Sequence, residues 1–385
     1  MEFLKRTYSI CFLIMVFSSC MYAQEEKNFV YERSSMHSMM IKHLNEKYVD
    51  IVETVFLKIP FPERFNEHNL GVKSISFAET GKNNLNNIKE FVSEVNIGKK
   101  MVAKWFDYNK QTNSFDMELI KQRGLYNANI GDHQKARASI RGKAMLEDAG
   151  ENLIKNTYLL VNDISYQSTC RKAGLEMRFS WKVDKGLKFL RKVGGFEVTV
   201  KSYLFRLKWN DDIAMKFYTK YYTEDGIRDK DKIEAFKTDN ELFKIEFVGE
   251  TSSAIKEQEF KTLKDPETFL MKLTKRTIDY NIALLQHKFE DFRIKAPLIS
   301  TNPLKADVGL KEDVRENSLF EVLERVIDED GKISYEKVGV IKPVKGKIKD
   351  NRYLAEEDAE SMLDATEFEV VSGNGLASGM LIREK

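Results

Sequence analysis

Aromatic side chains gather between residues 203 and 222 of the chain, with the basic residues Arg206 and Lys208 interleaved. The members are Tyr203, Phe205, Arg206, Lys208, Trp209, Phe217, Tyr218, Tyr221 and Tyr222. Because flat rings stack on the faces of sugars, we predict a ligand surface for a glycan or a protein here. Its expected binding residues are Tyr203, Arg206, Trp209, Tyr218 and Tyr221. Alternation of strand aromatics between core and surface is the commoner reason for such a concentration.

Acidic residues at the expected strand ends raise a second kind of chemistry. Asp107, Asp163 and Asp211 occupy such positions. Two carboxylates about 5 to 10 Å apart in a cleft serve as general acid and base in glycoside hydrolysis. A hydrolase acting on envelope polymers therefore remains the alternative to a binding protein. No serine has the G-x-S-x-G surround of a nucleophile elbow, although spacing alone does not exclude a triad.

Metal-binding and cofactor-binding motifs fail on their spacing. The five histidines are scattered, and none has the Glu and i, i+4 spacing of a zinc hydrolase helix: His37, His43, His68, His133 and His287. The segment from Asp328 to Gly331 lacks the first and last acids of a calcium loop and predicts a hairpin turn. The glycines near residue 375 have no following helix on which a phosphate could sit. We predict no metal and no cofactor.

The amino-terminal residues have the order of a secretory signal peptide. Lys5 and Arg6 precede an apolar run from Ile10 to Phe17, and small residues follow up to Ala23. Cleavage after Ala23 is the first expectation, and lipid attachment at Cys20 is the alternative. No later stretch approaches the roughly 20 apolar residues of a transmembrane helix, so none is expected in the mature chain.

Composition limits the classes of partner. The 385 residues are 42% hydrophobic and 32% charged, and the net charge of +2 is spread along the chain instead of forming blocks. This pattern argues against a nucleic-acid binder. After export only Cys170 would remain as a free thiol, so we expect no internal disulfide. The oligomeric state is not indicated.

Hydrophobic periodicity predicts an α+β or α/β layer domain over residues 99–264, after the signal at 1–23 and a mixed segment at 24–98. Its expected strands are Met101 to Phe106, Thr157 to Tyr166, Phe196 to Trp209 with a bulge near Ser202, and Leu242 to Val248. The expected helices are one ending near Gly98, one from Asp132 to about Leu153, and one capped by Asp211 and Asp212. Met36, Met39 and Met40, at near-helical spacing, are expected in a core.

The remaining sequence predicts a connecting helix over 265–297 and a small all-β domain over 298–385. Asp265 as cap and Pro266 as first helical residue begin the helix, which we expect to run to about Lys295 and to end at Ala296 and Pro297. The later strands should form a small SH3-like barrel packed against that helix. They are Leu319 to Ile327, Ile333 to Ile341, Val344 to Ile348, Glu367 to Val371 and Met380 to Ile382.

Several stretches resemble a family of exported proteins from Bacteroides-type Gram-negative bacteria that has no established activity. They are VAKWF at 102–106, RGLYNA at 123–128, NTYLLVNDISY at 156–166, YLFRLKWND at 203–211 and VGVIKPVKGKIKDNRY at 338–353. The resemblance covers nearly all of the mature chain and implies no catalytic residues. More distantly, ARASIRGKAMLEDAG followed by NTYLLVNDIS is similar to α/β domains of envelope-assembly proteins such as the curli secretion pore.

These observations together predict a non-enzymatic protein of the cell envelope, periplasmic or attached to the outer membrane. It would bind a protein partner or a glycan during assembly or maintenance of the surface. A hydrolase that uses paired carboxylates is the alternative.

Overall fold

The computed structural model describes residues 34–46, 48–77, 84–126, 149–169, 195–223, 229–258, 265–327, 333–357 and 363–385. Some predictions lie outside the described residues. They are the export signal at 1–23 with Cys20, the free thiol of Cys170, most of the helix expected from Asp132, and the turn at 328–331.

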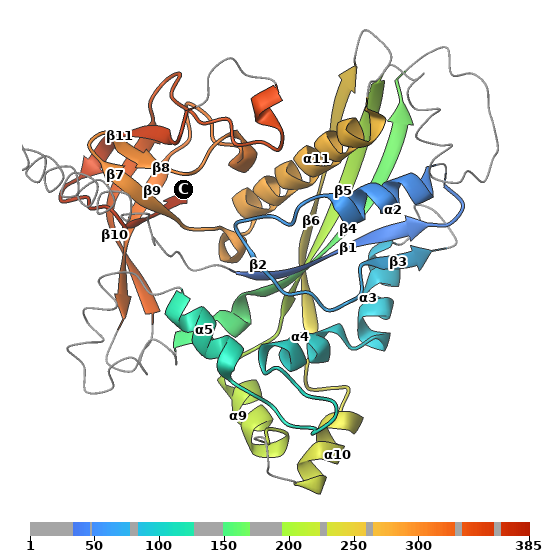
Figure 1. Ribbon diagram of the computed structural model, residues 1–385. Coiled ribbons are helices and arrows are strands. Elements are labelled where there is room, and N and C mark those ends of the chain that lie inside the picture. Colours follow the sequence, from blue (N-terminus) through green and yellow to red (C-terminus); the bar gives the residue numbers. More distant parts are fainter. Residues whose placement is uncertain are drawn as a thin grey trace, which may run out of the picture.

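A mixed sheet forms the middle of the larger part of the molecule (Figure 1). Its described strands are β1 Ser35–His43, β2 Asn66–Glu67, β3 Ser74–Phe77, β4 Thr157–Ser168, β5 Gly195–Leu207 and β6 Ile245–Gln258. The hydrogen-bonded order is β2-β1-β4-β5-β6, and β3 also pairs with β1. Strand β1 lies parallel to β2, β3 and β4, whereas β5 is antiparallel to β4 and β6.

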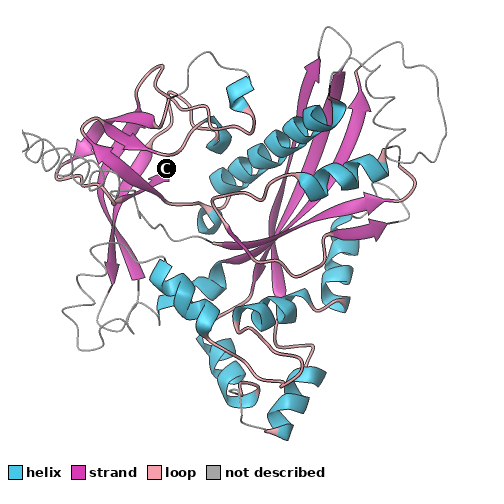
Figure 2. Ribbon diagram, in the orientation of Figure 1, coloured by secondary structure: helices cyan, strands magenta, loops and turns pink. Residues whose placement is uncertain are grey.

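Helices cover both faces of this sheet, as the layers in Figure 2 show. On one face lie α2 Val49–Lys58 and α11 Pro266–Lys288. On the other face pack α3 Asn84–Glu94, α4 Ile97–Trp105, α5 Glu118–Tyr126, the 3-10 helix η1 Ala149–Asn156, α9 Asp211–Lys220 and α10 Lys230–Thr238. Tyr158 and Leu160 of β4 therefore enter one core and Leu159 and Val161 the other, which explains why this strand is apolar throughout.

Helix α11 begins as the sequence predicts. The Asp265 carboxylate accepts hydrogen bonds from the backbone N–H groups of Glu267 at 3.1 Å and Thr268 at 3.3 Å, and Pro266 is the first helical residue. The predicted end near Lys295 is wrong, because the helix stops at Lys288. There the Arg293 guanidinium donates to two of the last helical carbonyls and so satisfies groups that further helix would have bonded.

The carboxyl-terminal part is a ring of antiparallel strands, seen beside the sheet in Figure 1. The described strands are β7 Ala296–Thr301, β8 Leu304–Ala306, β9 Phe320–Ile327, β10 Ile333–Pro343, β11 Thr366–Gly373 and β12 Leu381–Glu384. Their hydrogen-bonded order β10-β11-β8-β7-β12-β9 closes on itself around an apolar core. Short 3-10 helices at η2 Glu290–Phe292, η3 Leu310–Glu312 and η4 Ala355–Glu357 complete the described elements.

The α+β class is confirmed, whereas some predicted elements are wrong. Residues Met101 to Phe106 are not a strand, since Met101 and Trp105 lie on one buried face of α4. Residues 344–348 form a turn at Gly346 instead of a strand. Ala296 and Pro297 begin β7, which the sequence reasoning missed together with β8.

Two finer predictions for β5 and α9 need correction as well. The bulge expected near Ser202 lies between Leu204 and Phe205 in the pairing with β6. The cap of α9 is Asn210, whose Oδ1 accepts from the Ile213 N–H at 2.9 Å. Asp211 and Asp212 instead occupy the first turn, where acids favour the positive end of the helix dipole.

Strand β1 belongs to the segment expected as a separate mixed opening, at 24–98. It nevertheless pairs in parallel with β4 over seven residues, from Ser35 opposite Thr157 to Ile41 opposite Asp163. Its Met36, Met39 and Met40 are buried in the two cores, on a strand and not on a helix. The sheet therefore extends across the boundary expected at residue 98.

Candidate functional site

The predicted aromatic surface is largely part of the core below the sheet. Tyr203 and Tyr221 are 2% and 4% exposed, and the Tyr221 hydroxyl donates to Asp239 at 2.5 Å. Trp209 is half-buried, with its ring 6.0 Å from that of Phe217. This packing agrees with the alternative that the aromatic residues alternate into the core.

The remaining two predicted residues make local structural contacts. The Tyr218 hydroxyl bonds to Glu151, and burial together with this carboxylate raises the tyrosine pKa. Arg206 lies on the opposite face of β5, where it donates to the Lys155 carbonyl at 3.0 Å and pairs with Asp291 at 2.6 Å. The structure thus does not bring the five predicted residues together on one surface.

Of the three predicted acids, Asp163 lies in a polar cluster at the end of β1. The His43 Nε2 lies 2.8 Å from one Asp163 oxygen, and the Asn84 amide donates to the other at 2.7 Å. Both neighbours come from elements about 80 to 120 residues away in sequence, so spacing gave no signal of them. Asp107 and Asp211 are exposed and take no part in these contacts.

Glu46, just beyond β1, completes this cluster. Burial raises its pKa; the charge of His43 lowers it and that of Asp163 raises it. A carboxyl with a raised pKa near a second carboxyl is the combination that acid–base hydrolysis uses. We call Glu46, His43, Asn84 and Asp163 the β1-end cluster.

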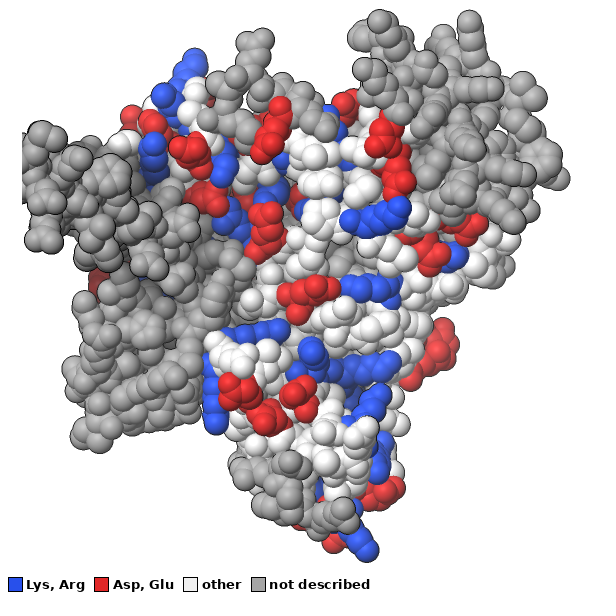
Figure 3. All heavy atoms as spheres, in the orientation of Figure 1, with Lys and Arg blue, Asp and Glu red and all other residues white. Residues whose placement is uncertain are grey.

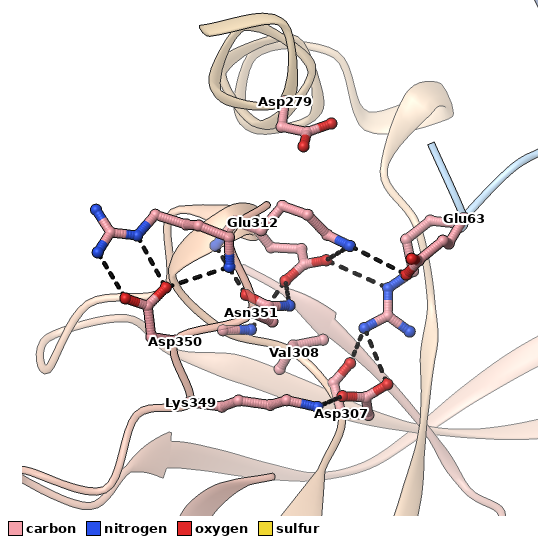
Figure 4. A network of polar contacts seen from close by, with 12 residues as sticks. Glu63, Asp279, Asp307, Val308, Glu312, Lys349, Asp350 and Asn351 are labelled. Atoms are coloured by element: carbon pink, nitrogen blue, oxygen red, sulfur yellow. Dashed lines mark hydrogen bonds and ion pairs between the residues drawn. The ribbon is translucent and has the colours of Figure 1, made fainter. Parts of the chain in front are cut away.

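A second polar site lies where the strand ring meets the α/β part, beneath α11 (Figure 4). This junction pocket has a volume of about 320 Å³. Its lining residues come from the loop after α2, from the segment that runs from the end of β8 through η3, and from the segment ending at η4. They are Glu63, Arg64, Asp307, Lys311, Lys349, Asp350, Asn351, Arg352, Leu354, Ala355 and Glu356.

Backbone contacts hold two of these segments, those at Gly309 and Lys349, next to each other. Gly309 forms a parallel bridge with Lys349, and a Cβ at Gly309 would lie 2.2 Å from the Lys349 carbonyl oxygen. Only glycine therefore permits this approach. Asn351 joins the same segments, because its Oδ1 accepts from the Lys311 N–H at 2.9 Å and its Nδ2 donates to Glu312 at 2.7 Å.

Ion pairs connect the walls of the junction pocket, as the dashed lines in Figure 4 show. Lys349 Nζ lies 2.7 Å from Asp307 Oδ1, and Arg64 Nε lies 3.2 Å from Glu312 Oε1. The Arg64 guanidinium also donates to the Asp307 carbonyl. Arg64 and Glu312 are only 12% and 10% exposed, so this pair joins the two parts of the molecule in a shielded place.

Two further pairs lie nearer the solvent. Lys311 Nζ lies 3.4 Å from Glu63 Oε2, and the Glu63 side chain is 84% exposed. The Arg352 guanidinium contacts both oxygens of Asp350, at 2.8 and 2.6 Å. Lys311 is only 14% exposed, so Glu63 is the member of the first pair that can turn into the solvent.

Neighbouring cations favour the ionised form of three carboxyl groups of the pocket, those of Glu63, Asp307 and Asp350. The charge of Lys311 lowers the pKa of Glu63, and the bond from Arg352 lowers the pKa of Asp350. Burial alone would raise the pKa of Asp307, but the bond from Lys349 and the charge of Arg64 outweigh it. None of these three acids has the raised pKa of a general acid.

Asp279 of α11 points toward this network from above in Figure 4. Burial raises its pKa although Lys275, one turn earlier on α11, forms an ion pair with it. It does not line the pocket, and within the described structure its second oxygen has no hydrogen-bond partner. Asp279 therefore lies behind the pocket wall.

The junction pocket presents charged side chains of both signs. Four of its lining residues are cationic and four are acidic: Arg64, Lys311, Lys349, Arg352, Glu63, Asp307, Asp350 and Glu356. On the face seen in Figure 3, basic and acidic residues are likewise interspersed. In the part of the chain that is described, no three His, Cys, Asp or Glu side chains could hold a metal ion.

The sequence contained a partial signal for this site. The stretch VGVIKPVKGKIKDNRY at 338–353 belongs to the family resemblance and carries Lys349 to Arg352, but the partners at Glu63 and Arg64 are almost 290 residues away. Neither comparison with protein-family models nor comparison with curated proteins gives a match to the chain. Among the described helices, none has the length and apolar character that crossing a membrane requires.

Proposed function

We propose that the protein is a non-enzymatic component of the cell envelope, in the periplasm or attached to the outer membrane. It binds a protein partner or a glycan during assembly or maintenance of the surface, and the junction pocket is the binding site. The observation that carries this proposal is the lining of that pocket by charged side chains of both signs from both parts of the molecule.

The ionisation of the pocket acids favours binding over hydrolysis. A general acid must hold a proton near neutral pH, and enzymes raise a carboxyl pKa to achieve this. Glu63, Asp307 and Asp350 are shifted the other way by their cationic partners. Ionised acids beside cations are suited to holding a charged ligand.

Export is part of the proposal, supported by the order of charged, apolar and small residues at 1–23 and by the resemblance to exported proteins. Amino-terminal sequencing of the native protein should begin at Gln24, or find a lipid on Cys20. A native protein that retains Met1 would contradict export. We also propose that the strand ring β7–β12 is SH3-like, as the later strands of the sequence suggest.

The binding role is tested by crosslinking in the native envelope. A Lys349→Met chain keeps the aliphatic stem but loses the ammonium group that pairs with Asp307, so recovery of the partner should fall about tenfold. Lys342→Met is the matched control, because Lys342 pairs with Glu369 at 2.9 Å outside the pocket. Equal recovery from both variants, at equal melting temperature, would contradict a role of the pocket.

The β1-end cluster is the observation that favours the hydrolase alternative. Glu46 with its raised pKa would serve as acid and Asp163 as base. If so, Asp163→Asn should abolish the release of soluble fragments from purified envelope polymers, whereas Lys349→Met should leave it unchanged. If the wild-type protein releases no fragments, the alternative is excluded for the polymers assayed.

A further inference from the structure

We propose that the junction pocket binds an extended peptide segment of a partner protein, which carries an apolar side chain next to charged side chains of both signs. This inference rests on the proposed binding function and narrows its ligand class from protein or glycan to peptide. Three features carry it: an apolar groove beside the pocket, the balance of charge in the pocket, and the absence of aromatic lining there.

The apolar groove lies on the other side of the loop after α2. Its volume is about 200 Å³, and its lining is mainly apolar: Ser38, Phe56, Leu57, Ile59, Pro60, Phe61, Pro62, Glu67, Lys73, Lys275 and Ile278. Leu57 is 56% exposed, which leaves apolar surface open to a ligand.

One short loop separates the groove from the pocket. Pro60 and Pro62 line the groove, whereas the next two residues, Glu63 and Arg64, line the junction pocket. Two prolines within three residues restrict the backbone of this loop, so the two sites keep their relative position. A ligand that crosses this loop would place an apolar group in the groove and charged groups in the junction pocket.

The balance of charge selects a ligand that also carries both signs. The four cationic and four acidic lining residues cancel, so a simple anion gains little net attraction. The Glu63 side chain is 84% exposed and can turn away from Lys311, so that a ligand with an acid and a base can pair with both residues. Peptides with alternating Lys and Glu side chains have this property.

The lining of the junction pocket disfavours a glycan. Sugar sites use aromatic faces for stacking, and the lining residues include no Phe, Tyr or Trp. Neutral sugars also offer no charge to exchange with the ion pairs. A peptide with charged side chains and one apolar anchor matches the pocket and the groove together.

The test is selection of peptides from a random heptapeptide phage library on the immobilised full-length protein. Peptides retained by the wild type should contain at least one acidic, one basic and one large apolar residue. Retention should fall about tenfold on Lys349→Met and on Glu63→Gln, but not on the control variants Lys342→Met and Glu290→Gln. Glu290 is similarly exposed and pairs with Arg383 away from the pocket.

Retained peptides without charged residues, or retention that is equal on pocket and control variants, would overturn the inference. Pocket-dependent binding to envelope glycan fragments, with no peptide selected, would also overturn it but leave the binding function intact. Loss of both peptide selection and pocket-dependent crosslinking in the envelope would overturn the proposed function itself. Melting temperatures within a few degrees of the wild type show that each variant is folded.

Discussion

Two buried histidines are held in one neutral tautomer by the groups around them. The His37 Nε2 lies 2.6 Å from the Val72 carbonyl and the His68 Nε2 lies 2.9 Å from that of Met101, so both Nε2 atoms donate. Each Nδ1 faces a donor, the Leu70 N–H or the Arg123 guanidinium. Protonation of either ring would turn this acceptor into a second donor.

We predict that stability falls with acid because of these histidines. Burial lowers the pKa of His37 to about 4 and that of His68 to about 3, from 6.5 when unfolded. Below pH 6.5 the unfolded chain therefore binds more protons, and stability is lost as pH falls toward 4. At pH 4.5 His37 should lower the free energy of unfolding by about 2.5 kcal/mol relative to neutral pH. Denaturant unfolding of the wild type and of His37→Gln from pH 7 to 4.5 measures this loss. Equal pH dependence of the unfolding free energy in both proteins would refute the role of His37.

Gly98 shows how a residue type can mislead at this scale. The sequence predicts that a helix ends near Gly98. In the structure Gly98 lies in the first turn of α4, against the backbone of the loop that follows α10. A Cβ at Gly98 would lie 2.4 Å from the Phe243 carbonyl oxygen, which is closer than atoms can pack. The glycine is needed for close packing, and sequence alone does not distinguish this role from helix termination.

Gly98→Ala should accordingly destabilise the fold by about 2 to 3 kcal/mol, because helix and loop must move apart. Alanine normally stabilises a helix relative to glycine, so the sign of the effect is informative. The exposed Ser93→Ala in α3 is the control and should change stability by less than about 0.5 kcal/mol. A neutral or stabilising Gly98→Ala in thermal unfolding would show that the contact relaxes freely.

At the scale of elements, local signals predicted helix starts and buried strands well. Asp265 and Pro266 mark the first turn of α11 by local bonds, and β4 and β5 are long runs of β-forming residues. Local signals failed where the same residues fit both the periodicity of a strand and that of a helix. MVAKWF suits a strand, but a helix also places Met101, Val102 and Trp105 on one buried face. Tertiary packing decides such cases.

A buried polar ladder joins α11 to the sheet. The Asn281 amide donates to the Val200 carbonyl at 2.7 Å and to Ser202 Oγ at 3.1 Å. Ser202 in turn donates to Asn162 at 2.7 Å, and Asn162 donates to Ser38 at 3.3 Å. Because these hydrogen bonds are surrounded by apolar contacts, they fix the position of α11 along the strands.

We predict that Asn281→Leu, which leaves this ladder without its helix end, lowers the free energy of unfolding by about 2 to 3 kcal/mol. Tyr166→Phe, which removes one hydroxyl contact with Thr274 at 2.7 Å in the same interface, should lower it by about 1 kcal/mol. Urea unfolding measures both. An Asn281→Leu variant as stable as the wild type would mean that α11 is held by apolar contacts alone.

At the scale of the whole molecule, long-range pairing decides where the sites form. The parallel pairing of β1 with β4 brings His43 to Asp163, and the closing of the strand ring brings Lys349 to Asp307 and the neighbouring Arg64. No local sequence pattern predicts these long-range contacts. The sequence therefore predicts the α+β class, but it gives no signal that Lys349, Asp307 and Arg64 lie together.

The shielded pair of Arg64 and Glu312 should hold the two parts of the molecule in place. Arg64→Met leaves Glu312 without this partner, so we expect a loss of about 3 kcal/mol and faster amide hydrogen exchange at residues 309–312. Arg315→Met is the control, since Arg315 is 60% exposed and its ion pair is with the nearby Asp313. Unchanged exchange at 309–312 in Arg64→Met would show that apolar packing alone positions the ring.

We expect a partner to occupy the junction pocket in the cell, and photocrosslinking measures this occupancy. A photoreactive amino acid at the exposed position Glu356, which lines the pocket, should give one discrete adduct; the same group at exposed Met215 on α9 should not. The adduct should weaken when Lys349→Met is added. Identical adducts from both positions, or none from Glu356 in intact cells, would show that no partner occupies the pocket.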